Sequence, residues 1–456
     1  MRGGRAAVPF ADRRADRSDE DYDSRRVSLA HGCLLRHRIT MLHHTVVDYT
    51  IRVNERLLMS ITDEELIRRA HDLLDEVDPK TVDQVTFRGA QYDAGLAWLH
   101  FPPGFGGLGL SRGRQAVVDQ VLRAGGNPYH DLFVNVIGIG MGAPTILEYG
   151  TEEMWHRHLR PIFTGEHIWC QLFSEPANGS DIAGIPSRAI RDGDDWIVNG
   201  QKVWTTLAHK ASWAMLLTRT DPDVPKHQGL SYFLLDMTSP GVTVRPLVQL
   251  TGDAEFNEVF LNDVRVPHAN MLGAPGDGWK VTTATLMNER VALGGGGGGK
   301  GGGPIRTLMR VWESRRDQLP SSQRAVLRDQ VADLWVRAEV LRLNNQRAKD
   351  LAATGKAGPG FSIGKLMTGE LSQAIFEVCV ELLGADGMLH PEGYPLKRLE
   401  GPATNGSITA QLLRSRANTI EGGTSEIQRN ILGEKILGLP GDIRVDKGIP
   451  WRDLAK

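Results

Sequence analysis

The chain has 456 residues, of which 41% are hydrophobic and 24% charged, and its 53 lysines and arginines nearly balance 55 acidic residues. These values are typical of a soluble globular protein of about three domains, or of one large domain with an insertion. They exclude a strongly basic nucleic-acid-binding protein, and no apolar run approaches the roughly 20 residues that span a bilayer. The cysteines, Cys33, Cys170 and Cys379, lie far apart and form no CxxC pair or disulfide framework, so we expect a cytoplasmic protein.

Residues 1–58 differ in composition from the rest of the chain. They contain eleven arginines, eight acidic residues and no lysine. The stretch 13–26 mixes both charges and has almost nothing apolar to bury, which favours disorder. The paired arginines are not followed by the apolar run of an export signal. We therefore expect 1–58 to be a disordered or non-native extension.

Residues 59–170 are expected to form an N-terminal helical domain. Thr62, with Glu65 three residues later, has the pattern of a capping box at a helix start. Apolar residues then recur at a helical spacing, at Leu66, Ala70 and Leu73.

Residues 171–272 change to short apolar runs separated by Asp, Pro and Gly turns, which predicts a central antiparallel β domain. Within 196–204, Asn199–Gly200 stands between two apolar runs. That dipeptide is a strong signal for a hairpin turn, so we expect the chain to reverse there.

Residues 273–456 return to helical patterns and predict a C-terminal four-helix-bundle domain, which gives an α+β multi-domain fold overall. Two long apolar stripes repeat every three or four residues, as buried seams in bundles do. They comprise Leu327, Val331, Leu334, Ala338 and Leu341, and Met367, Leu371, Ile375, Val378 and Leu382, and Gly384 follows the second as a helix stop.

Two glycine-rich stretches resemble nucleotide-binding loops only superficially. In 294–303, Lys300 is followed by glycine instead of the Ser or Thr of a phosphate-binding loop, which favours a helix interruption. In 138–143 the spacing fits a dinucleotide fingerprint, but no alternating strand–helix pattern surrounds it, which favours close helix packing. The paired histidines near 43 and 156 lack metal-ligand spacing, and we expect no metal site.

Three other segments carry groups suited to a flat polar ligand. FSEPANGSD (173–181) is a turn of exposed main chain and short hydroxyls, and QKVWTT (201–206) places an aromatic ring beside two hydroxyls. In 416–440, glycines separate Glu421 from a new helix that Thr424 or Ser425 can cap.

Together these segments resemble the acyl-CoA dehydrogenase family of flavoproteins, in the right order and over about residues 59–456. The stretches 148–162 and 259–267 resemble the connectors that flank the family's β domain. The resemblance implies an N-terminal helical domain, a middle β domain and a C-terminal helical bundle. It also implies FAD as cofactor and an acyl-CoA substrate.

The resemblance implies specific contacts with FAD. By position, Gln171, Phe173 and Ser174 approach the pyrimidine edge, Trp204 flanks the ring and Thr206 lies near N5. Gly179 and Ser180 lie near the phosphates and the start of the acyl-CoA cleft. The cofactor-binding set implied is Gln171, Phe173, Ser174, Gly179, Ser180, Trp204, Thr206, Thr424 and Glu426, with Ser180 and Arg290 on the substrate.

The family's reaction is α,β-dehydrogenation, in which a carboxylate removes the α proton and the β hydride passes to the flavin. The usual base precedes Gly-Thr at the last helix, but that position here is Gly422, with Glu421 one residue earlier. Other members carry the base in a Glu-Arg pair, which here is Glu289–Arg290. We therefore expect Glu289 to be the base, with Glu421 as the second candidate.

The diphosphate contacts depart from the family pattern. The Arg-x-x-Phe-Gly segment is absent from 313–330, where Arg315 or Arg316 can substitute, and Glu381 stands where glutamine is usual. Carboxylates repel a diphosphate. Two alternatives to an oligomeric dehydrogenase (a homo- or hetero-oligomer, dimer or tetramer) that reduces an electron-transfer flavoprotein stay open. One is a partner-completing subunit of a heteromer, and the other is an oxidase or monooxygenase on the same fold.

Overall fold

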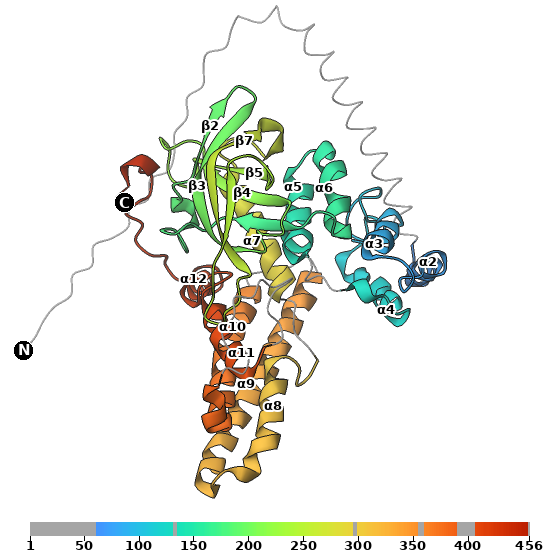
Figure 1. The fold of residues 1–456 in the computed structure, drawn as a ribbon, viewed down its shortest axis with the longest axis vertical. Coiled ribbons are helices and arrows are strands. Elements are labelled where there is room, and N and C mark those ends of the chain that lie inside the picture. The colour runs from blue at the N-terminus through green and yellow to red at the C-terminus, as the bar shows by residue number, and fades with distance from the viewer. Residues whose placement is uncertain (1–60, 131–134, 295–298, 354–359, 390–405, 455–456) are drawn as a thin grey trace, which may run out of the picture. The chain divides into compact units, whose positions relative to one another are not determined.

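The computed structural model describes residues 61–130, 135–294, 299–353, 360–389 and 406–454 (Figure 1). The expectation for residues 1–58 lies outside this part of the chain.

The first part of the fold is helical. Thr62 caps the first helix, and its hydroxyl accepts a hydrogen bond from the main-chain N–H of Glu65 at 3.3 Å. The predicted positions Leu66, Ala70 and Leu73 are buried. The helices are α2 Asp63–Glu76, α3 Gln84–Asp93, α4 Gln115–Ala124, α5 Ala143–Tyr149 and α6 Glu152–Thr164.

A mixed sheet follows the helices. Its strands are β1 Trp169–Leu172, β2 Arg188–Asp192, β3 Asp195–Thr206, β4 Trp213–Arg219, β5 Leu230–Asp236, β6 Val242–Pro246, β7 Phe256–Pro267 and β8 Met271–Leu272. They lie in the order β6-β7-β3-β2-β4-β5-β8, and β1 pairs with β4. Most pairs are antiparallel as predicted, but β1 and β4 run parallel, and so do β2 and β4.

The predicted hairpin at Asn199–Gly200 is wrong, because β3 runs straight through it and the chain reverses earlier, between Asp192 and Asp195. A β-carbon at Gly200 would stand 1.9 Å from the Ser187 hydroxyl, so glycine serves close strand approach here. The pairing register shifts between Val198 and Gly200, as at a β-bulge.

Both faces of the sheet are buried. One face packs against the helical part through a cluster that includes Trp169, Tyr232, Ile146 and Leu159. The other face holds a second cluster around Phe233. The strands that carry the expected site are therefore fixed from both sides.

The C-terminal part is a helical bundle. Its helices are α7 Gly278–Gly294, α8 Pro304–Arg315, α9 Ser321–Ala353, α10 Gly360–Leu383, α11 Ile408–Ser415 and α12 Ser425–Lys435. The predicted stripes on α9 and α10 form its core, and Gly384 follows α10 with a φ of +59°. Helix α7 contacts α5, β5 and α10, so it joins the sheet to the bundle (Figure 1). The three-part fold predicted from the sequence is confirmed.

Both glycine-rich stretches lie at helix ends. The polyglycine run separates α7 from α8, with residues 295–298 outside the described part. Gly138–Gly142 is a π-helical turn that leads into α5, so 138–143 is not the strand-to-helix loop of a dinucleotide site. Among the described residues, no helix is long and apolar enough to cross a membrane.

Candidate functional site

The turn after β1 and the end of β3 lie side by side. The main-chain N–H of Val203 donates to the Ser174 carbonyl at 3.0 Å, and Lys202 Nζ donates to the Phe173 carbonyl at 3.2 Å. Phe173 is buried edge-on against Tyr232, while Gln171 and Ser174 are half-buried. The first two predicted motifs are thus brought together.

A buried ion pair supports this junction. Lys202 is fully buried, Glu175 is 3% exposed, and Lys202 Nζ lies 2.7 Å from Glu175 Oε1. Lys202 also donates to the Leu217 carbonyl, and Glu175 accepts from the Ser187 N–H. Burial lowers the pKa of Lys202, and the Glu175 carboxylate opposes that shift. Sequence analysis missed this pair, although both residues stand inside the two motifs.

Trp204 has an unusual conformation for a strand residue. Its φ is +60°, at an irregularity in the β3–β7 pairing, and its side chain is 58% exposed. Its ring meets Phe256 edge-on, with centroids 6.0 Å apart. Strained backbone at an exposed aromatic residue is a feature of binding sites. Thr205 beside it is buried, and Thr206 is half-buried.

The outer part of the first turn is open. Gly179 and Ser180 are exposed, and a β-carbon on Gly179 would meet no atom within 4 Å. Next to them, Lys226 binds both Asp181 and Asp446 of the C-terminal tail. The predicted phosphate and substrate contacts at 179 and 180 therefore lie on an accessible surface.

Glu289 and the turn before α12 meet at one point. A β-carbon built on Gly422 would lie 3.5 Å from Glu289 Oε1 and 3.6 Å from Lys365 Cε. Glu289 is half-buried on α7 and Lys365 is half-buried on α10. The Glu289 carboxylate thus lies close to where a side chain at position 422 would project. The side chain of Arg290 lies outside the described part.

Glu421 is held in another way. Both its carboxylate oxygens accept hydrogen bonds of 3.0 Å from the Arg414 guanidinium. Arg414 also lies 3.5 Å from the buried Glu255 and 5.7 Å from the Phe256 ring, the same ring that Trp204 meets. A bidentate ion pair of this kind occupies a carboxylate. Arg414 was not predicted, and no sequence signal singles it out.

Thr424 and Glu426 form the start of α12. Thr424 is the N-cap and accepts from the Ile427 N–H at 3.2 Å, as expected for one of the two candidates. Glu426 is exposed in the first helical turn, and hydrogen bonds from its own N–H and from Thr424 lower its pKa. Both residues have structural roles that leave their predicted contact with FAD untested.

Arg315, the expected substitute for a diphosphate contact, is already paired. Its guanidinium lies 2.7 Å from the Asp386 carboxylate, in the 3-10 helical turn Gly384–Met388 that follows α10. The positive charge is thus largely balanced by the protein itself.

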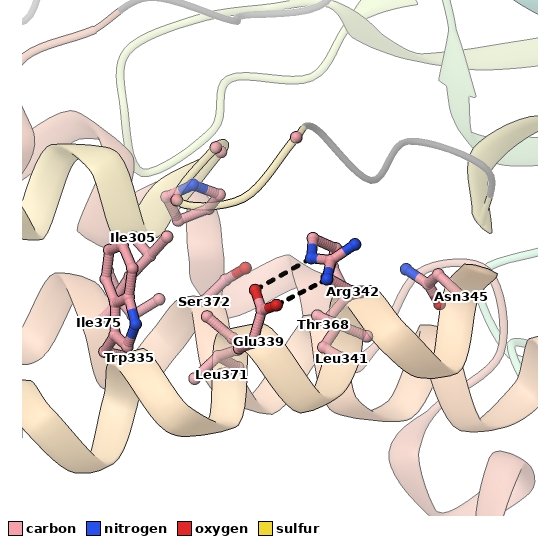
Figure 2. Close-up of a pocket in the computed structure, with 16 residues that line it drawn as sticks. Ile305, Trp335, Glu339, Leu341, Arg342, Asn345, Thr368, Leu371, Ser372 and Ile375 are labelled. Atoms are coloured by element: carbon pink, nitrogen blue, oxygen red, sulfur yellow. Dashed lines mark hydrogen bonds and ion pairs between the residues drawn. The ribbon is translucent and has the colours of Figure 1, made fainter. Parts of the chain in front are cut away.

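The described helices of the C-terminal part border at least two cavities. Figure 2 shows the smaller, about 100 Å³, with Trp335 at one end and the Glu339–Arg342 ion pair beside it. Glycines 299 and 301–303 line its wall. The larger, about 290 Å³, lies between the loop before β7 and helices α10 and α11, and includes Arg414. In the described residues, no group of three or more His, Cys, Asp or Glu could hold a metal ion.

Comparison with known families gives three consecutive matches. Residues 58–166, 170–264 and 276–437 match the N-terminal, middle and C-terminal domains of acyl-CoA dehydrogenase.

Individual relatives agree with these matches. Acyl-CoA dehydrogenase FadE34 of Mycobacterium tuberculosis is 40% identical over 76% of this chain. The match covers 45% of FadE34, so this chain spans about half the length of that relative. Acyl-CoA dehydrogenase IpdE1 of the same organism is 36% identical, over 77% of this chain and 86% of its own.

Two solved structures share the fold. The ChsE4-ChsE5 complex from Mycobacterium tuberculosis has a TM-score of 0.61 at 30% identity, over 83% of this chain and 98% of that one. The Tcur3481-Tcur3483 steroid ACAD has a TM-score of 0.63 at 26% identity, over 85% and 98%.

Proposed function

Because the chain belongs to the acyl-CoA dehydrogenase family, whose members are FAD-dependent oxidoreductases, we propose that it catalyses α,β-dehydrogenation of an acyl-CoA thioester with Glu289 as the base. One observation carries this assignment. The Glu289 carboxylate lies 3.5 Å from the β-carbon position of Gly422, the position that aligns with the base in the usual family pattern. A carboxylate supplied from α7 thus reaches the place that the last turn leaves vacant.

The residues around the motif junction fit a flavin ring. The exposed Trp204 offers an aromatic face. The turn beside it contributes the main chain of Phe173 and the half-buried Ser174 hydroxyl, and the end of β3 contributes the half-buried Thr206 hydroxyl. The buried Thr205 hydroxyl has no hydrogen-bond partner in the described part of the chain, so a polar ligand atom can satisfy it. When bound, FAD supplies the acceptor for the hydride that leaves the substrate β carbon.

Glu289 would take the α proton onto a carboxylate oxygen. It is half-buried, and a carboxylate away from bulk water is a stronger base. An α C–H is a weak acid, so hydrogen-bond donors to the thioester carbonyl must stabilise the enolate charge that develops. Ser180 and Arg290 are proposed to contact the substrate outside this centre.

Glu421 is the less suitable base. Its two oxygens each accept a hydrogen bond from Arg414, so both are already occupied. We assign the Arg414–Glu421 pair to holding the turn in front of α12.

We propose that the acyl group is bulky or cyclic. Two observations support this. Glycines 299 and 301–303, which follow Glu289 in the sequence, add no side chains to the wall of a cavity of about 100 Å³. Among relatives, one structure is a steroid ACAD, and a 27% identical enzyme of Syntrophus aciditrophicus is a cyclohexane-1-carbonyl-CoA dehydrogenase.

The test is anaerobic titration of the purified yellow protein with a panel of straight, branched and ring-bearing acyl-CoAs. Bleaching of the flavin band by at least one of them supports the proposal, and the strongest response is expected for a ring-bearing chain. A protein that binds FAD but is reduced by none of them contradicts it.

A partner-completing role in a heteromer is the second candidate. Arg315 is balanced by Asp386, which weakens its contribution to a diphosphate site, and one structural neighbour is the ChsE4-ChsE5 complex. If the chain stays colourless with added FAD but turns yellow with a second acyl-CoA dehydrogenase chain, this candidate holds.

We propose an electron-transfer flavoprotein as the electron acceptor. Rapid reoxidation of the substrate-reduced protein by air would instead indicate an oxidase or monooxygenase on the same fold. Stopped-flow mixing with oxygen distinguishes the two.

A further inference from the structure

Lys365 joins the turn before α12 to the region of Glu289. It projects from α10, and its ammonium donates to the Asn418 carbonyl at 3.1 Å and to the Gly423 carbonyl at 2.5 Å. These two carbonyls lie on either side of Gly422. A lysine ammonium has three donors, so one remains after these bonds.

The same lysine lies beside the proposed base. Its Cε and Glu289 Oε1 are both in van der Waals range of one point, the β-carbon position of Gly422. Burial lowers the pKa of Lys365, whereas the carboxylates of Glu421, Glu289 and Glu426 oppose that shift. The ammonium therefore interacts electrostatically with Glu289 across the vacant position.

Two further carboxylates, one from the turn and one from α12, also interact with Lys365. Glu421, in the turn, accepts hydrogen bonds from the two terminal nitrogens of the Arg414 guanidinium. Glu426, on α12, is exposed and interacts electrostatically with Arg429. Glu289, on α7, is the carboxylate that lies beside the β-carbon position of Gly422, as Lys365 does.

We propose that Lys365 is a positioning residue for the base: it holds the Gly422 turn open through two carbonyls and keeps the Glu289 carboxylate ionised beside it. The inference rests on the proposed function, since it needs Glu289 to be the base. In proton abstraction the substrate Cα–H bond breaks and an O–H bond forms on Glu289. The C–H electron pair stays with the substrate as the enolate, and Lys365 is not consumed.

The sign of the effect follows from the charges. A nearby cation favours the ionised carboxylate, so removing it raises the pH above which the base is active. For Lys365→Gln we expect the acid limb of the rate profile to move up by about one pH unit, so that the rate on that limb falls roughly tenfold at a given pH and recovers at high pH. A residue that only braces the turn would lower the rate equally at all pH values.

The experiment uses the FAD-loaded protein and two readouts. One is the rate of flavin reduction by an active acyl-CoA from pH 6 to 10. The other is exchange of the α hydrogens of a 3-thiaacyl-CoA, which is not oxidised, with deuterium from the solvent, followed by mass spectrometry. The exchange reports proton abstraction without net oxidation. Lys349→Gln, an exposed lysine on α9, is the matched control and should leave both profiles unchanged.

A shifted acid limb in both readouts for Lys365→Gln supports the inference, and an unshifted limb overturns it. Lys365→Arg tests it independently if the glutamine variant does not fold. Because arginine keeps the charge, its acid limb must stay in place, and a displaced limb overturns the inference. If the unmodified protein neither bleaches nor exchanges, the proposed function itself has failed.

Discussion

Glu289 Oε1 on α7 approaches Gly422 in the turn before α12, with only 3.5 Å between the oxygen and the place of a β-carbon on the glycine, although the two residues are far apart in the sequence. Position 422 has φ +64°, which glycine adopts without strain. The missing side chain and the carboxylate from α7 are thus complementary. A glutamate at position 422 would project towards the carboxylate that Glu289 already supplies.

The first prediction concerns the base. Glu289→Gln should slow flavin reduction by about 10²–10⁴-fold, since it removes the proton acceptor while keeping the shape. The flavin spectrum should not change. Glu421→Gln should weaken the reaction only modestly through the loss of its ion pair with Arg414. Anaerobic stopped-flow absorbance measures both, and a larger effect at Glu421 would reverse the assignment.

The second prediction concerns the glycine. Gly422→Ala should destabilise the protein by about 1–2 kcal/mol because of its positive φ, and should reduce the rate because its methyl group would lie in contact with the Glu289 carboxylate. Gly438→Ala is the control, since Gly438 also has a positive φ, +67°, but no atom within 4 Å of the β-carbon position. Both should lose stability in urea unfolding, and only Gly422→Ala should lose activity.

The base position can also be exchanged. In a Glu289→Gln background, Gly422→Glu should restore flavin reduction at least roughly tenfold, since its carboxylate would reach the same place. Restoration by Gly422→Gln, which has no carboxylate, would show that the proton acceptor lies elsewhere.

The features that could be predicted are those that depend on residues close together in the sequence. The helix start at Thr62, the apolar seams of α9 and α10, and the two motifs of the junction follow from spacing and local chemistry. The prediction of a hairpin at Asn199–Gly200 is wrong. Glycine is needed at position 200 because Ser187 lies too close for a β-carbon, and not because the chain turns there. Local propensity does not reveal such a contact.

The relations within the site were harder to predict. Arg414 binds Glu421, seven residues later, and also reaches Glu255 and Phe256 in a distant segment. Lys365 likewise lies beside Glu289, which is far away in the sequence. Each is an ordinary helix residue by its local pattern. Only the fold brings them to the same place.

The third prediction concerns the buried Glu175–Lys202 pair. Lys202→Met should cost about 3–5 kcal/mol of unfolding free energy, since it leaves Glu175 charged and unpaired in the core. Lys226→Met is the control: its partners Asp181 and Asp446 are more exposed, and the loss should be under about 1 kcal/mol. Equal losses in urea unfolding would mean that Glu175 is not charged in the fold.

The fourth prediction is a dependence of stability on pH. His158 is 1% exposed between Trp169 and Trp213, and burial lowers its pKa to about 3. Because the unfolded histidine has a pKa near 6.5, the unfolded chain takes up the proton first as the pH falls. The stability that His158 contributes is therefore complete above about pH 6.5 and lost between there and about pH 3, at up to about 1.4 kcal/mol per unit.

His158→Phe should flatten the dependence of stability on pH between about pH 3 and 6.5. Phenylalanine fills the space between Trp169 and Trp213 but does not titrate. Urea unfolding at pH 5 and pH 7 measures the difference. His156→Phe, at an exposed position on the same helix, should leave the slope unchanged. An unchanged slope in His158→Phe would mean that the acid sensitivity arises from other groups, such as His100, whose pKa burial lowers to about 4.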